Sequence, residues 1–142
     1  MSNYQIIALK SGADNYIWLV RDSVHAILID PTEALVVKNY LSQHQLKLQA
    51  ILLTHGHSDH IGGVSELVSL YDPAIIDNFH GQLIESQMIQ VGDFPEFKVI
   101  LAPGHTTEHV VYLFDGQHLF CGDVLFSLGC GLVFTKDFAA SY

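Results

Sequence analysis

The sequence predicts a single layered domain of the α/β class. Short apolar runs typical of buried strands, as at 48–53, alternate with segments of helical periodicity, as at 64–70. The residues able to do chemistry follow directly after predicted strand ends, where α/β proteins place their functional sites. The chain has 142 residues, of which 49% are hydrophobic and 15% charged, so it can bury a core of its own. We therefore expect one domain over residues 1–142.

The first half of the chain alternates strands with helices. Apolar runs bounded by turn residues predict four strands, at 4–10, 16–21, 25–30 and 48–53. The third strand ends at Asp30, which either supports a ligand or merely ends the strand before a proline. Thr32 is a candidate N-cap for the helix that follows, in which Ala34, Val37 and Leu41 recur on one face. A second helix is predicted over 64–70.

The second half reads mainly as strands. Short strands are predicted at 74–76, 88–91 and 98–101. A hairpin of 110–114 and 118–121 is expected around Asp115-Gly116, a strong two-residue turn signal. Periodicity alone indicates one layered α/β domain and does not specify its topology.

The segment 54–63 holds three imidazoles and a carboxylate within six residues. Histidine is the commonest ligand for zinc-like ions, and carboxylates also bind them. His55 and His57 are two apart, so they point the same way in an extended segment. Asp59 and His60 follow too closely to join the same small tetrahedron. The spacing predicts two neighbouring ions, one for each pair; the alternative is a histidine-rich surface loop without a bound metal.

Residues 54–60 match the T-H-x-H-x-D-H motif of the metallo-β-lactamase superfamily. Three further segments resemble the glyoxalase II branch, the hydroxyacylglutathione hydrolases: 14–18 (DNYIW), 103–109 (PGHTTEH) and 120–131 (FCGDVLFSLGCG). The resemblance extends from about residue 12 to Gly131. It implies an αββα sandwich, with two mixed sheets face to face and helices outside.

The resemblance also implies which residues bind metal. His55, His57 and His105 would hold a first ion, and Asp59 and His60 would hold a second. Zinc is the expected metal, and the same donors would accept iron or manganese. Residues that bind the substrate are not predicted.

Asp123 completes the implied set by bridging both ions with one carboxylate. A hydroxide held between the ions would attack a thioester carbonyl, and Asp59 is the candidate to orient it or receive its proton. The thiol leaves as a thiolate (pKa about 8.5), so no strong general acid is needed. The function implied is hydrolysis of S-(2-hydroxyacyl)glutathione to a 2-hydroxy acid and glutathione.

The sequence departs from the glyoxalase pattern after Gly131. A basic position of the pattern is Leu132 here, and an aromatic position is Phe134, which lacks a hydroxyl. One further histidine and a helical domain of the family have no counterpart up to Tyr142. We therefore expect a sandwich incomplete at its C-terminus, a weakly held second ion, and self-association through the incomplete sheet.

These departures leave two alternatives open. One is a metallo-hydrolase of the same superfamily that acts on another small ester, thioester or lactone. The other is a metal-binding fragment with little or no turnover. His25, His44, His80 and His118 are expected to be surface or packing residues. His109 is expected to support a metal ligand or to be structural, and not to bind metal itself.

The composition restricts the partners. Six Lys and Arg face fifteen Asp and Glu, a formal net charge of −9, so a phosphate-backbone partner is not expected. No apolar run approaches the roughly 18 residues of a membrane span. The stretch 1–5 lacks the basic and apolar regions of a signal peptide. We therefore expect a small-molecule substrate, neither nucleic acid nor membrane as partner, and a cytoplasmic location.

Overall fold

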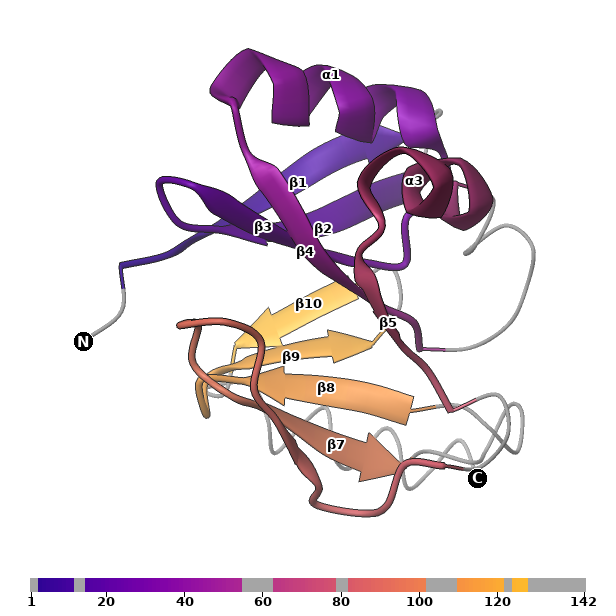
Figure 1. The fold of residues 1–142 in the computed structure, drawn as a ribbon. Coiled ribbons are helices and arrows are strands. Elements are labelled where there is room, and N and C mark those ends of the chain that lie inside the picture. Colours follow the sequence, from indigo (N-terminus) through magenta and orange to yellow (C-terminus); the bar gives the residue numbers. More distant parts are fainter. Residues whose placement is uncertain are drawn as a thin grey trace.

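In the part of the chain that the structure describes, two five-stranded sheets pack face to face, and helices α1 (Ala34–His44) and α3 (Val64–Tyr71) cover the outer face of the first (Figure 1). This computed structural model describes residues 3–11, 15–54, 63–78, 82–101, 110–121 and 124–127. The strand order is β1-β2-β3-β4-β5 in the first sheet and β10-β9-β8-β7-β6 in the second. The described part is thus the helix–sheet–sheet portion of the predicted sandwich, and the α/β class is confirmed.

The first sheet is mixed. Its strands are β1 (Gln5–Ser11), β2 (Asn15–Arg21), β3 (His25–Ile29), β4 (Lys47–Leu52) and β5 (Ala74–Ile76). The pairs β1–β2 and β2–β3 are antiparallel, whereas β3–β4 and β4–β5 are parallel. Parallel neighbours need long crossover connections, which here contain the two helices, α1 (Ala34–His44) and α3 (Val64–Tyr71).

Helix α1 begins differently from the prediction. Its N-cap residue is Glu33, which makes no side-chain capping bond. The predicted cap, Thr32, instead shares a 2.8 Å hydrogen bond with the Ser11 hydroxyl at the end of β1. The cap prediction was therefore wrong, because a tertiary partner takes the threonine hydroxyl. The predicted buried face is confirmed: the buried residues of α1 are Ala34, Val37 and Leu41.

An aliphatic core lies between the helices and the first sheet. Its buried members are Leu9, Ile17, Leu19, Ala26, Leu28, Ala34, Val37, Leu41, Leu46, Leu48, Ile51, Leu53 and Leu67. The last of these is the buried residue of α3. An ion pair of 2.5 Å between Lys38 and Glu66 joins the two helices at the surface. Burial of this aliphatic surface holds the helical layer in place.

The second sheet is antiparallel throughout its described pairs. Its strands are β6 (Met88–Ile89), β7 (Phe97–Leu101), β8 (Val110–Phe114), β9 (His118–Cys121) and β10 (Val124–Ser127). The predicted turn at Asp115-Gly116 is confirmed, with φ of 55° and 66° at the two residues. β10 was not predicted, because its four residues form a strand only by pairing with β9.

A second core, rich in aromatic residues, lies between the two sheets. Its buried members are Val20, Ile27, Ile29, Ala50, Leu52, Val91, Phe94, Phe97, Val99, Val110, Tyr112, Phe114 and Phe120. Rings of β7 and β8 stack closely, with 4.5 Å between the centroids of Phe97 and Phe114. Trp18 of β2 packs against the same core and lies 6.4 Å from Phe120. Aromatic burial therefore joins the sheets.

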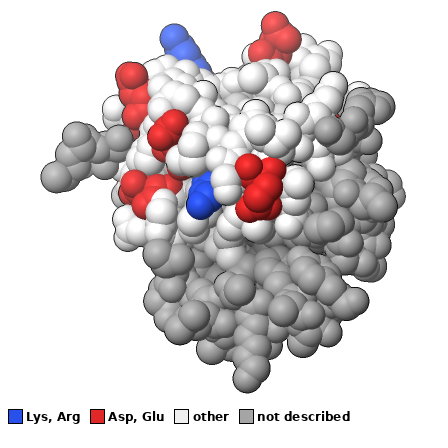
Figure 2. All heavy atoms as spheres, turned by 90° about the horizontal axis from the view of Figure 1, so that it is seen from below, with Lys and Arg blue, Asp and Glu red and all other residues white. Residues whose placement is uncertain are grey.

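The surface of the described part is acidic, in keeping with the net charge of −9 (Figure 2). Acidic side chains are spread over the described area of the face shown, among fewer basic ones. Within the described residues, no helix has the length and apolar character needed to cross a membrane.

Candidate functional site

The predicted metal ligands all lie outside the residues that the structure describes. They are His55, His57, Asp59, His60, His105 and Asp123. Their positions therefore stay predictions. Within the described residues, no group of three or more His, Cys, Asp or Glu side chains could hold a metal ion. The structure does describe the residues that flank each predicted ligand segment.

Two of the ligand segments connect neighbouring strands of the second sheet. Segment 102–109 starts after Leu101 of β7 and leads into β8, and segment 122–123 starts after Cys121 of β9 and leads into β10. Because these strands alternate in direction, both connections lie at the same end of the strands. This end of the sandwich is called the site end.

The third ligand segment, 55–62, leaves the first sheet after Thr54, which is held at the same end. The Thr54 carbonyl accepts a 2.9 Å hydrogen bond from the backbone N–H of Val110, the first residue of β8. The Thr54 N–H and hydroxyl donate to the two carboxylate oxygens of Asp30, at 2.9 and 2.5 Å. Asp30 is 1% exposed and has a φ of 50°. The buried carboxylate thus fixes the backbone next to the first predicted ligand.

Leu53, one residue earlier, is also held from the second sheet. The hydroxyl of Tyr112 donates to the carbonyl of Leu53 at 2.7 Å. The N–H of Leu53 donates to the carbonyl of Ile76 at 2.9 Å. Burial raises the pKa of Tyr112 well above its ordinary value, and the nearby charge of Asp30 raises it further. The phenol therefore stays protonated, and a donor, at neutral pH.

The far end of segment 55–62 returns to the connection between β3 and α1. The N–H of Gly63 donates to the carbonyl of Pro31 at 3.1 Å. A Cβ atom on Gly63 would lie 2.7 Å from the carbonyl carbon of Glu33, so only glycine fits this approach without a backbone shift. One short connection, beginning at Asp30, therefore holds both ends of the segment.

Sequence reasoning missed part of this arrangement. Of the two roles left open for Asp30, the structure favours support of the ligand segment, through Thr54. Tyr112 was assigned only to a strand, because a tyrosine between apolar residues looks like core and its acceptor lies 59 residues away. No local signal would have identified it.

Three histidines expected to be surface or packing residues are confirmed as such. His44 is exposed and stacks on Tyr40, with 4.2 Å between ring centroids. His118 contacts the Tyr4 ring edge-on at 6.2 Å. His25 is half-buried at the start of β3, beside a surface turn described next. His80 and His109 are outside the described residues.

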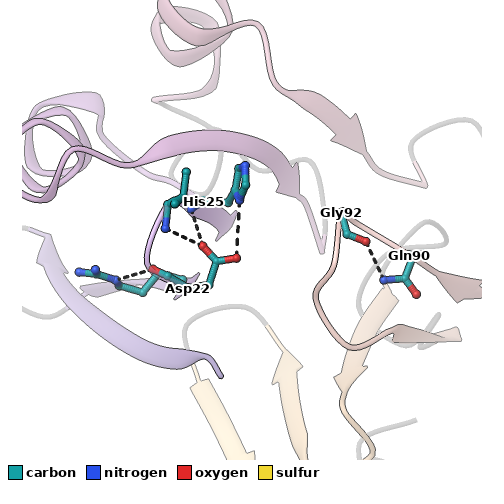
Figure 3. A network of polar contacts seen from close by, with 6 residues as sticks. Asp22, His25, Gln90 and Gly92 are labelled. Atoms are coloured by element: carbon teal, nitrogen blue, oxygen red, sulfur yellow. Dashed lines mark hydrogen bonds and ion pairs between the residues drawn. The ribbon is translucent and has the colours of Figure 1, made fainter. Parts of the chain in front are cut away.

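The opposite end of the sandwich, named here the turn end, carries the β2–β3 and β8–β9 turns. One carboxylate oxygen of Asp22 accepts from the N–H groups of Val24 and His25 at 2.8 and 2.6 Å, and the other lies 3.6 Å from the His25 ring (Figure 3). Partial burial opposes ionisation of Asp22, but the two backbone N–H groups outweigh it and lower the pKa of the carboxyl. The phenol of Tyr4 donates to Asp115 at 2.8 Å.

A second polar contact near the turn end joins Gln90 to the carbonyl of Gly92 at 3.0 Å (Figure 3). An open cavity of about 420 Å³ also lies at this end, away from the strand ends that flank the predicted ligands. Its lining residues are Asn3, Tyr4, Gln5, Arg21, Asp22 and Ser23. These lining residues include no cluster of metal-binding side chains, so the cavity is not a candidate metal site.

Comparison with known proteins agrees with the fold and the motifs. Residues 12–78 match the metallo-beta-lactamase superfamily. The BLEG-1 B3 metallo-beta-lactamase superposes with a TM-score of 0.71 at 24% identity, over 88% of this chain and 74% of that one. ETHE1 from Myxococcus xanthus superposes with a TM-score of 0.68 at 26% identity, over 84% and 56%. The chain therefore has the metallo-beta-lactamase fold, and its residues 12–78 are similar to that superfamily.

The chain is similar to hydroxyacylglutathione hydrolases. It is 42% identical to that of Glaesserella parasuis serovar 5, over 97% of this chain and 61% of the relative. It is 42% identical to that of Yersinia enterocolitica, over 96% and 57%. The resemblance seen in the motifs is thus confirmed, and the chain spans 61% and 57% of the length of these two relatives.

Proposed function

We propose that the chain hydrolyses S-(2-hydroxyacyl)glutathione to a 2-hydroxy acid and glutathione, as a metal-dependent thioesterase of the glyoxalase II type acting in the cytoplasm. The observation that carries the proposal is the convergence at the site end. The residues flanking segments 55–62, 102–109 and 122–123 lie at one end of the sandwich. The Val110–Thr54 hydrogen bond joins the two sheets there.

The donor chemistry of these segments fits a pair of zinc ions, and would also accept iron or manganese. His55, His57 and His105 would hold the first ion, and Asp59 and His60 the second. When bound, the ions supply Lewis-acid stabilisation of the developing oxyanion and a water of lowered pKa.

The other steps belong to the protein. Asp123 would bridge the two ions, and Asp59 would orient the attacking water and take its proton. The sulfur leaves as a thiolate, because a thiol pKa of about 8.5 makes protonation by an enzyme acid unnecessary. We expect the second ion to be held more weakly, since three of the predicted ligands would hold it (Asp59, His60 and Asp123) and four would hold the first.

One sequence feature favours a second candidate, hydrolysis of another small ester, thioester or lactone. Leu132 occupies a position that is basic in the glyoxalase pattern, so a charge-assisted contact to glutathione is missing. Such contacts are worth roughly 1.5–3 kcal/mol each, enough to shift the preference between substrates. We also propose that two copies of the chain associate by pairing through β10, which is an outer strand of the second sheet in its described part.

The test is turnover by the zinc-loaded chain of S-lactoylglutathione and a panel of other thioesters and lactones. His105→Ala should lower kcat/KM at least about 100-fold, because even partners of metal ligands cost 10–100-fold when removed. His44→Ala is the matched control and should leave kcat/KM unchanged, since His44 is exposed on α1. Gel filtration of the same samples gives the oligomeric state.

Each outcome has a stated meaning. Higher kcat/KM on a lactone or another thioester would select the second candidate. Turnover that survives complete removal of metal by chelator would overturn both candidates. Tight metal binding without turnover of any substrate would leave only a metal-binding protein.

A further inference from the structure

The hydroxyl of Tyr112 crosses from the second sheet to the first. Tyr112 lies in the middle of β8, is fully buried, and donates to the carbonyl of Leu53 at 2.7 Å. Leu53 and Thr54 are the last residues before segment 55–62. The bond therefore acts on the backbone directly before the segment that contains two predicted ligands, His55 and His57.

This bond is one of a pair. Val110, two residues earlier in β8, donates its backbone N–H to the carbonyl of Thr54 at 2.9 Å. Two successive carbonyls of the first sheet are thus held by two positions of one strand. Two attachment points fix both the separation and the direction of the Leu53–Thr54 backbone relative to β8, whereas a single bond would act as a pivot. Segment 102–109, which contains His105, leads directly into the same strand.

The ring of Tyr112 has a separate role. It packs edge-on against Phe97 at 6.4 Å within the core between the sheets, and a phenylalanine ring would fill the same space. A buried hydroxyl loses its hydration on folding and gains little over an apolar group unless its bond is needed. Packing explains the ring, so the role of the hydroxyl must lie in its hydrogen bond to Leu53.

We propose that Tyr112 is a positioning residue for the metal centre. Its hydroxyl holds the start of segment 55–62 at the distance from β8 at which His55, His57 and His105 share one ion. The inference rests on the proposed function, because it concerns the same site. Zinc–nitrogen bonds span only about 2.0–2.1 Å, so a small change of this distance is felt at the ion.

The test compares Tyr112→Phe with Tyr4→Phe. Each variant keeps the ring and removes a short phenolic hydrogen bond, of 2.7 Å to Leu53 and 2.8 Å to Asp115. Tyr112→Phe also removes a long contact of 3.5 Å to the carbonyl of Ile76. Only the first bond lies at the site end. We expect Tyr112→Phe to weaken zinc binding by about 10–100-fold, measured by competition with a chelator, as removal of groups that orient ligands does elsewhere. Zinc affinity of Tyr4→Phe should stay within about twofold of the wild type.

A second readout separates positioning from stability. The visible absorption of the cobalt(II)-loaded protein reports ligand geometry, and it should change in Tyr112→Phe but not in Tyr4→Phe. Thermal unfolding of both metal-free variants measures the stability loss itself. If Tyr112→Phe is not folded at the assay temperature, the titrations are run in trimethylamine N-oxide, which favours the compact state of both variants.

Equal zinc affinities and equal cobalt spectra in the two variants would overturn the proposal. The titration needs no substrate, so its result is independent of turnover. A weakened Tyr112→Phe together with no thioester hydrolysis by the wild type would refute the proposed function alone. Hydrolysis by the wild type with equal affinities would refute the positioning role alone, and a wild-type chain that binds no zinc would refute both.

Discussion

Two aspartates at opposite ends of the sandwich each accept two short hydrogen bonds from the backbone and side chains around them. Asp30, at the site end, binds Thr54 and is 1% exposed. Asp22, at the turn end, binds Val24 and His25, and its side chain is 29% exposed. Water can replace Asp22 as an acceptor but cannot reach the groups that Asp30 satisfies.

The difference extends to the bonds between the sheets. At the site end the cross-sheet bonds are buried and act on the backbone next to the predicted ligands. At the turn end the cross-sheet bond joins two side chains, Tyr4 and Asp115, that are partly exposed. Similar bonds thus hold the backbone beside the predicted ligands at one end and stabilise only a surface turn at the other. Burial makes the difference, because it decides what losing a bond costs.

The largest expected difference in stability is between variants that lose the carboxylate of Asp30 and variants that lose that of Asp22. Asp30→Ala deprives two buried donors of Thr54 of this acceptor and should lower the free energy of unfolding by about 2–5 kcal/mol. Asp22→Ala should cost about 1 kcal/mol, as loss of an exposed capping side chain does. Urea denaturation of the metal-free variants measures both. Equal losses would show that burial does not separate the two ends.

Substitution of one glycine at each end of the sandwich should show the same contrast in stability, with smaller losses. Gly63→Ala, at the site end, forces a Cβ into the backbone of Glu33 and should cost about 1–3 kcal/mol. Gly116, in the β8–β9 turn, has a φ of 66°, and a Cβ atom added there would meet nothing within 4 Å. Gly116→Asn should therefore cost less than about 1 kcal/mol, because asparagine tolerates left-handed backbone. The same denaturation experiment ranks them, and a costlier Gly116→Asn would contradict the contact described for Gly63.

The smallest expected effect concerns pH at the turn end. Burial, together with the bond to Asp115, raises the pKa of Tyr4 from 10.0 to about 12. The folded state therefore holds this proton more tightly than the unfolded state, and the stabilisation is fully present below pH 10 and lost as pH rises through 12. The stability difference between wild type and Tyr4→Phe should be constant up to about pH 9 and shrink from there. Thermal unfolding at pH 8–12 checks this; a constant difference would argue against the bond.

Local sequence patterns were enough for most of the fold. The buried face of α1 and the helix after Gly63 follow from periodicity, which needs no knowledge of distant residues. Thr32 was misassigned because its partner, Ser11, lies 21 residues away, and β10 was missed because it depends on β9. Errors occurred where a distant segment decides the local structure.

The same division holds for the candidate site. The motif around His55 predicts four ligands, and the resemblance at two later segments implies His105 and Asp123. All six stay predictions because they lie outside the described residues. The bonds that hold the neighbouring backbone link Thr54 to Asp30 across 24 residues and Leu53 to Tyr112 across 59. Spacing within a motif carries no information about such partners, so they could be found only in the folded structure.

The connection between β3 and α1 holds both ends of segment 55–62, at Thr54 and at Gly63. In evolutionary terms, we expect these two anchors to let the residues between them vary. The ends of the segment are joined by the scaffold, so doubling its length would cost only about 0.6 kcal/mol of closure entropy. We expect that residues between Thr54 and Gly63 can be replaced or inserted without changing the register of β4 or the start of α3, because both ends are held by hydrogen bonds of the scaffold. A lineage can thus alter the chemistry carried between these two residues while both sheets stay as they are.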